Sequence, residues 1–117
     1  MAQDDERRAR VLALNESAHR KANERFMRLP FNRGFEQVAF VCECGAPICR
    51  EDVTLSIDEY EHIRAHPTWF VIAAGHEEPD TTLERIVDAK RSYVVVEKVG
   101  FAGAEAARRN PRDVDAA

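Results

Sequence analysis

The stretch Phe40-Val-Cys42-Glu-Cys44-Gly-Ala-Pro-Ile-Cys49 decides the fold, because it places three thiols within eight residues. All cysteines of the chain lie in this stretch, so a metal site is a better interpretation than a disulfide framework. Gly45 and Pro47 allow a turn tight enough for backbone N–H groups to face the sulfur atoms. Gln37 to Val41 and Asp52 to Leu55 are typical of strands. The sequence therefore predicts a zinc-binding hairpin.

The spacing Cys44-x4-Cys49-x12-His62-x3-His66 offers one way to complete the site, since it matches a two-cysteine, two-histidine zinc finger. However, a helix is expected from about Ile57 to Ala65, and His62 lies on nearly the opposite face of that helix from its apolar residues. We therefore expect His62 and His66 to face water rather than a metal ion.

His76 offers the other way to complete the site. It follows the strand-like segment Thr68 to Ala73, which can deliver the imidazole to the cysteine hairpin. Two alternatives remain open, namely buried cysteines without a ligand and a turn histidine without one. A redox switch of the same thiols ranks below zinc. The favoured ligand set is Cys42, Cys44, Cys49 and His76, with zinc as the cofactor.

The remaining pattern predicts an α+β fold. Apolar residues recur at helical spacing from about Gln3 to Leu29, and Ser56-Ile-Asp-Glu59 is a capping box for a second helix. A second hairpin is expected over 85–98 and a short helix over 102–109. The prediction is a long N-terminal helix and a small antiparallel sheet with one packed helix, built around the zinc-binding hairpin. Its parts are an N-terminal helical arm (1–34), a zinc-stabilised α+β domain (35–100), and a short helix with a flexible tail (101–117).

Composition limits the classes of function. The 117 residues suffice for about one domain, and 44% hydrophobic with 32% charged residues indicates a chain that folds. The net charge of −4 divides into +3 over residues 1–35, −8 over 36–90 and +1 over 91–117. The acidic middle disfavours nucleic acid, which would have to bind the basic N-terminal helix. No apolar run is long enough to cross a membrane, and the N-terminus lacks the basic, then apolar, pattern of a leader, so we expect a cytoplasmic protein.

These patterns favour a small structural-zinc protein that acts as a binding or regulatory module for another macromolecule. We expect no catalysis, because four protein ligands leave no position for a reactive water. The alternatives are a zinc-thiolate redox sensor, a nucleic-acid-binding zinc finger that uses the basic N-terminal helix, and a small zinc hydrolase. A protein partner or a second copy is expected on the N-terminal helix, where the candidate contact residues are Val11, Leu14, Arg25, Phe26 and Arg28.

The chain also resembles a family of small, largely uncharacterised actinobacterial proteins. The likeness covers about residues 15–100 and rests on the segments 40–49, 53–64, 70–77 and 94–98. It is most specific in the Cys-x-Cys-x4-Cys pattern and in the later Gly75-His76-Glu77 turn. The resemblance implies that His76 is the fourth ligand and that His62 and His66 are not ligands. It implies no established activity.

Overall fold

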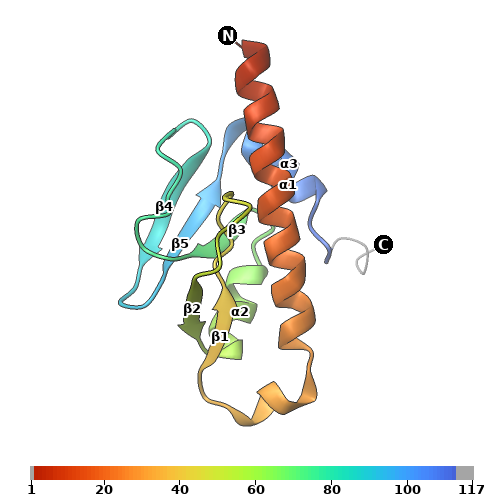
Figure 1. Ribbon diagram of the computed structural model, residues 1–117, viewed down its shortest axis with the longest axis vertical. Helices are drawn as coiled ribbons and strands as arrows, with labels where there is room; N and C mark the ends of the chain where they lie inside the picture. Colours follow the sequence, from red (N-terminus) through yellow and green to blue (C-terminus); the bar gives the residue numbers. More distant parts are fainter. Residues whose placement is uncertain (1, 113–117) are drawn as a thin grey trace.

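One long helix, two shorter helices and two small antiparallel sheets make up the fold of residues 2–112, the part of the chain that this computed structural model describes (Figure 1). The predicted α+β class is confirmed. The flexible tail predicted at the C-terminus falls largely on residues 113–117, outside the described part. The elements are α1 (Ala2–Met27), a 3-10 turn (Pro30–Gly34), β1 (Val38–Val41), β2 (Asp52–Leu55), α2 (Ile57–Arg64), β3 (Trp69–Ile72), β4 (Glu84–Ala89), β5 (Val94–Lys98) and α3 (Gly100–Arg108).

The strands form two sheets where the sequence led us to expect one. β1 and β2 make a hairpin in which Val38 is opposite Leu55, and the cysteine loop joins the two strands. The second sheet has the order β3-β5-β4, and all of its pairings are antiparallel. The capping box is present, because Ser56 Oγ accepts the Glu59 N–H at 3.0 Å and the Ser56 N–H donates to Glu59 Oε1 at 2.8 Å. The capping box fixes the start of α2 directly after the hairpin.

The three-stranded sheet separates two apolar clusters. Successive side chains of a strand point to opposite faces, so Val95 faces one cluster while Val94 and Val96 face the other. The first cluster joins the β1–β2 hairpin and α2 through residues such as Phe40 and Tyr60, whose rings stack 4.4 Å apart. The second cluster contains all three cysteines and reaches Ala106 of α3. The cysteine loop is therefore part of the core.

α1 runs the length of the molecule with both sheets on one side of it, and its N-terminal end extends past the other elements (Figure 1). The helix is joined to the rest of the fold mainly by buried polar side chains. Arg20 is fully buried, donates from one guanidinium nitrogen to the Pro67 carbonyl at 2.8 Å, and lies 4.5 Å above the Phe70 ring. Glu24 accepts from Arg64 Nε of α2 at 2.7 Å. These contacts make α1 a packed element along its C-terminal half, and the domain boundary at residue 34 stays a prediction.

None of the helices within residues 2–112 combines the length and the hydropathy that a membrane-spanning segment requires.

Candidate metal centre

Three thiols and one imidazole converge at the end of the β1–β2 hairpin. Cys42 directly follows β1, Cys49 precedes β2, and His76 comes from the turn after β3. The ligand atoms of the set all lie within 4.8 Å of one another; the set is Cys42, Cys44, Cys49 and His76. These are the four residues named from the sequence. Their donor atoms are geometrically suited to bind a metal ion.

The distances around His76 match those of a tetrahedral site. Its Nδ1 atom lies 3.5 Å from Cys42 Sγ and 3.6 Å from Cys49 Sγ. A tetrahedral ion with bonds of about 2.3 Å to sulfur and about 2.0 Å to nitrogen separates these donor atoms by about 3.5 Å. The imidazole therefore already lies at the corner that a fourth ligand would occupy.

The surroundings of the thiols favour a cation. Burial raises the pKa of Cys42 to about 12, although backbone N–H groups of Ala73 and Cys44 work in the opposite direction. The Ala73 N–H donates to Cys42 Sγ at 3.2 Å. Burial also raises the pKa of Cys44, against a hydrogen bond from the Ala46 backbone. Buried thiols stay protonated without a counter-charge, and a bound metal ion deprotonates them, while these N–H groups are placed to stabilise the resulting thiolates.

The second ring nitrogen of His76 is held by a carboxylate. Nε2 lies 2.9 Å from Oε2 of Glu51, which precedes β2. A proton on Nε2, donated to Glu51, leaves the Nδ1 lone pair facing the sulfur atoms, as a metal ligand requires. The sequence analysis did not identify Glu51. Its position two residues after the last cysteine is the only signal that the sequence offers.

Glu43 lies between Cys42 and Cys44 in the sequence, and its buried side chain anchors the cysteine loop through hydrogen bonds to neighbouring elements. Its side chain is fully buried, and Oε2 accepts from Asn23 Nδ2 at 2.9 Å and from the Tyr60 hydroxyl at 2.6 Å. Oε1 accepts from the Val71 N–H at 3.0 Å, and the Glu43 N–H donates to the Val71 carbonyl at 2.8 Å. Burial raises the pKa of Glu43 against these hydrogen bonds. Glu43 thus ties the cysteine loop to β3, the strand that delivers His76, and is not placed to act as a base at the site.

α1 closes the outer side of the loop. Asn15 Nδ2 donates to the Gly45 carbonyl at 2.8 Å, and His19 Nδ1 lies 2.9 Å from the Cys44 carbonyl oxygen. A Cβ atom at Gly45 would lie 2.5 Å from Leu12 Cδ2, so a larger residue here would force the Leu12 side chain of α1 to shift. His19 therefore supports the loop through the backbone of Cys44 and is not among the metal-facing residues.

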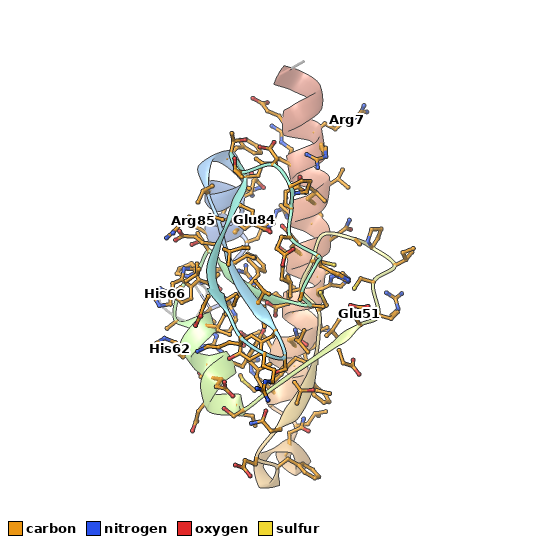
Figure 2. The ribbon with its side chains drawn as sticks, turned by 90° about the vertical axis from the view of Figure 1, so that its left-hand side faces the viewer. Arg7, Glu51, His62, His66, Glu84 and Arg85 are labelled. Carbon is orange, nitrogen blue, oxygen red and sulfur yellow. The ribbon has the colours of Figure 1, made fainter. Side chains whose placement is uncertain are left out.

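His62 and His66 lie away from the thiols, as expected. Figure 2 shows both at one edge of the molecule and Glu51 at the opposite edge. The His66 ring stacks on Trp69 at 3.6 Å, whereas His62 is exposed. The finger-like spacing in the sequence thus has no counterpart in the structure of the described residues.

Beside the centre lies a groove of about 480 Å³ that both Cys44 and His76 line. Its other side holds a buried ionic cluster in which Lys98 is bonded to Glu16 and to Glu84. Burial raises the pKa of Glu16 to about 7, while Lys98 counteracts that rise. The sequence analysis missed this cluster because its members come from three separate elements.

The candidate contact residues on α1 divide into two groups. Val11 and Leu14 are 52% and 51% exposed, and Arg25 and Arg28 are exposed as well. Phe26 is instead half-buried, with its ring edge-on to Phe40 at 6.1 Å. Four of the five residues are therefore available to a partner.

Comparisons of the chain with protein-family models, with curated proteins and with solved structures found no match. The resemblance to the actinobacterial family stays a prediction.

Proposed function

We propose that the chain is a small structural-zinc module that binds another macromolecule in the cytoplasm. The observation that carries the proposal is the cluster of three thiols and one imidazole within 4.8 Å. Zinc is the ion that such sulfur-rich tetrahedral sets most often hold in proteins. A reducing compartment such as the cytoplasm keeps the thiols available for the ion.

A structural role agrees with the ligand count. A catalytic zinc ion typically has three protein ligands and one water, whereas four protein ligands complete the tetrahedron. The core position of the cysteine loop points the same way, because an ion there links β1, β2 and the end of β3. On this proposal the ion fastens the fold, and the exposed face of α1 makes the functional contact.

The test is metal analysis of purified protein with two histidine variants. Wild type should carry about one zinc ion per chain, and His76→Ala should lower both the zinc content and the melting temperature. His62→Ala is the matched control, because His62 is exposed and far from the thiols. Equal zinc content in the two variants would contradict the ligand assignment.

A second candidate function, a zinc-thiolate redox sensor, is favoured by one observation. The groove of about 480 Å³ lined by Cys44 and His76 gives an oxidant a path to the site. A sensor releases zinc in step with thiol oxidation when treated with peroxide. Full retention of zinc at peroxide concentrations that oxidise free thiols would rule this function out.

A further inference from the structure

The exposed face of α1 borders a groove that the metal centre does not use. This groove has a volume of about 850 Å³ and is formed by α1 on one side and by the C-terminal end of α3 with the residues that follow it on the other. α1 and α3 lie side by side (Figure 1). The exposed residues that line this side of the groove are Leu14, Ala18, Lys21 and Arg25 of α1, and Arg28, which directly follows the helix.

These residues continue a seam of coiled-coil spacing. Starting from Val11, one set of exposed positions recurs alternately three and four residues apart, through Leu14, Ala18, Lys21 and Arg25 to Arg28, just after the end of α1. Such spacing is the pattern by which one helix packs along another. The half of the seam near Val11 is apolar, and the half near Arg28 is cationic. A partner that matches the seam must therefore be apolar at one end and anionic at the other.

The cationic half of the groove is reinforced from α3. Arg108 and Arg109 line the facing wall, where both bond to Glu105. Within the described part of the chain, the cations on the α1 side of the groove, Lys21, Arg25 and Arg28, form no ion pair with another residue. Among the described residues, Glu24 is the only acidic one that lines the groove, and it is buried and already bonded to Arg64 and Arg112. The groove is thus strongly positive on a chain whose net charge is −4.

We propose that this groove binds an amphipathic helix of a partner protein, with apolar side chains against Val11 and Leu14 and carboxylates against Arg25 and Arg28. The inference rests on the proposed function and names the class of its partner. A helix in a groove buries the apolar half of the seam and pairs the cationic half in a single contact. Carboxylates one helical turn apart on the partner match the one-turn spacing of the α1 cations.

The same features disfavour two other occupants. A nucleic-acid strand would contact the cations but leave Val11 and Leu14 without apolar contacts, and no aromatic side chain lines the described groove for base stacking. A second copy of α1 in parallel would bring Arg25 and Arg28 against their own counterparts. In an antiparallel pair with Lys21 opposite Val11, Arg25 would face Arg7. Both arrangements place like charges together.

The test uses zinc-loaded full-length protein and synthetic peptides three heptads long. Two fluorescent peptides carry leucine at the seam positions of one half and glutamate at those of the other half, one for each direction of binding. A third peptide has lysine in place of glutamate, and a labelled oligouridylate represents nucleic acid. We expect one glutamate peptide to bind best, and Arg25→Glu to weaken its binding at least about tenfold. Arg91→Glu, an equal charge change in the turn between β4 and β5, should have little effect.

A charge-swapped variant distinguishes loss of binding from misfolding, because a folded variant should bind the peptide of opposite charge. The double variant with Arg25→Glu and Arg28→Glu should prefer the lysine peptide over the glutamate peptides. The proposal is overturned by equal binding of the lysine and glutamate peptides to wild type, by tighter binding of the oligouridylate, or by a salt-sensitive dimer in sedimentation that Arg25→Glu abolishes. Zinc content is measured on every sample. A chain that discriminates between the peptides without carrying zinc would overturn the proposed structural-zinc function and leave the groove assignment standing.

Discussion

The Nε2 atom of His76 lies 2.9 Å from Oε2 of Glu51, while Nδ1 of the same ring faces the thiols. Glu51 therefore orients the ring through the nitrogen that does not face the thiols. We expect Glu51→Ala to lower zinc affinity by about 10- to 100-fold without changing the stoichiometry, as loss of such a carboxylate typically does. Competition with a chromogenic chelator measures the affinity. Asp52→Ala, which removes the next exposed carboxylate, should leave the affinity unchanged, and equal effects of the two substitutions would contradict the orienting role.

Zinc binding should release protons. Because burial raises the pKa of Cys42 to about 12 and also raises that of Cys44, both thiols are protonated at neutral pH without a metal ion. Binding must then displace at least about two protons per ion, and zinc affinity must fall as the pH falls. Titration calorimetry in buffers of different ionisation enthalpy measures the release. A binding enthalpy that does not depend on the buffer would show that the thiols are not ligands.

Asn23 of α1 bonds both to β1 and to Glu43 of the cysteine loop. Its Nδ2 atom donates to the Val41 carbonyl at 2.8 Å and to Glu43, and its Oδ1 atom accepts the Val41 N–H at 2.8 Å. Asn23→Ala should lower the free energy of unfolding by about 2–4 kcal/mol, because it leaves buried polar groups without partners. Urea denaturation measures the change. Lys21→Ala, an exposed position on the same helix, should cost less than about 0.5 kcal/mol, and similar costs would mean that α1 is a separate arm.

Glu16 should make stability depend on pH in an unusual direction. Burial raises the pKa of Glu16 in the folded chain to about 7 from 4.5, so the folded state holds a proton that the unfolded state loses. The stabilising contribution of Glu16 to the free energy of unfolding is fully present below about pH 4.5 and is lost as the pH rises to about 7. As the pH rises from about 5 to about 8, the free energy of unfolding of Glu16→Gln should therefore increase relative to that of wild type, by on the order of 1–3 kcal/mol.

Urea denaturation of wild type and Glu16→Gln, each at about pH 5 and about pH 8, measures how the difference in their free energies of unfolding changes with pH. Effects of pH on zinc binding cancel in the comparison, because both chains keep the same four candidate ligands. The exposed Glu6 supplies a control, and Glu6→Gln should follow wild type at both pH values. A stability difference between Glu16→Gln and wild type that stays constant with pH would show that Glu16 is ionised in the folded state throughout.

The parts of the fold that sequence could predict depend on neighbouring residues. The turn after Cys44, the capping box at Ser56 and the strand before His76 each follow from a few consecutive side chains. Setting His62 aside needed only the direction of the helix face, and His76 was favoured because a strand-like segment directly precedes it. The candidate site was therefore within reach of sequence analysis, because its thiols are close together in the chain.

The parts that sequence could not predict depend on pairs of distant residues. The face of α1 that contacts the rest of the fold carries Arg20, Asn23 and Glu24, and each of these buried side chains has a hydrogen-bond partner outside α1. The periodicity of apolar residues does not reveal a helix face that is buried through polar side chains. The same helix leaves Val11 and Leu14 exposed. Which side of an amphipathic helix turns inward was thus decided by polar complementarity across the fold.

The alternation of side chains through Cys42, Glu43 and Cys44 has a consequence for the order of assembly. The outer two residues are candidate metal ligands, whereas the side chain of the middle one is held by Tyr60 and Val71. We expect the hydrogen bonds of Glu43 to hold the loop in place even without an ion, so that the binding site is already formed when an ion arrives. Loading is therefore expected to come after folding, and a cell short of zinc would accumulate empty but intact chains that are ready to be filled.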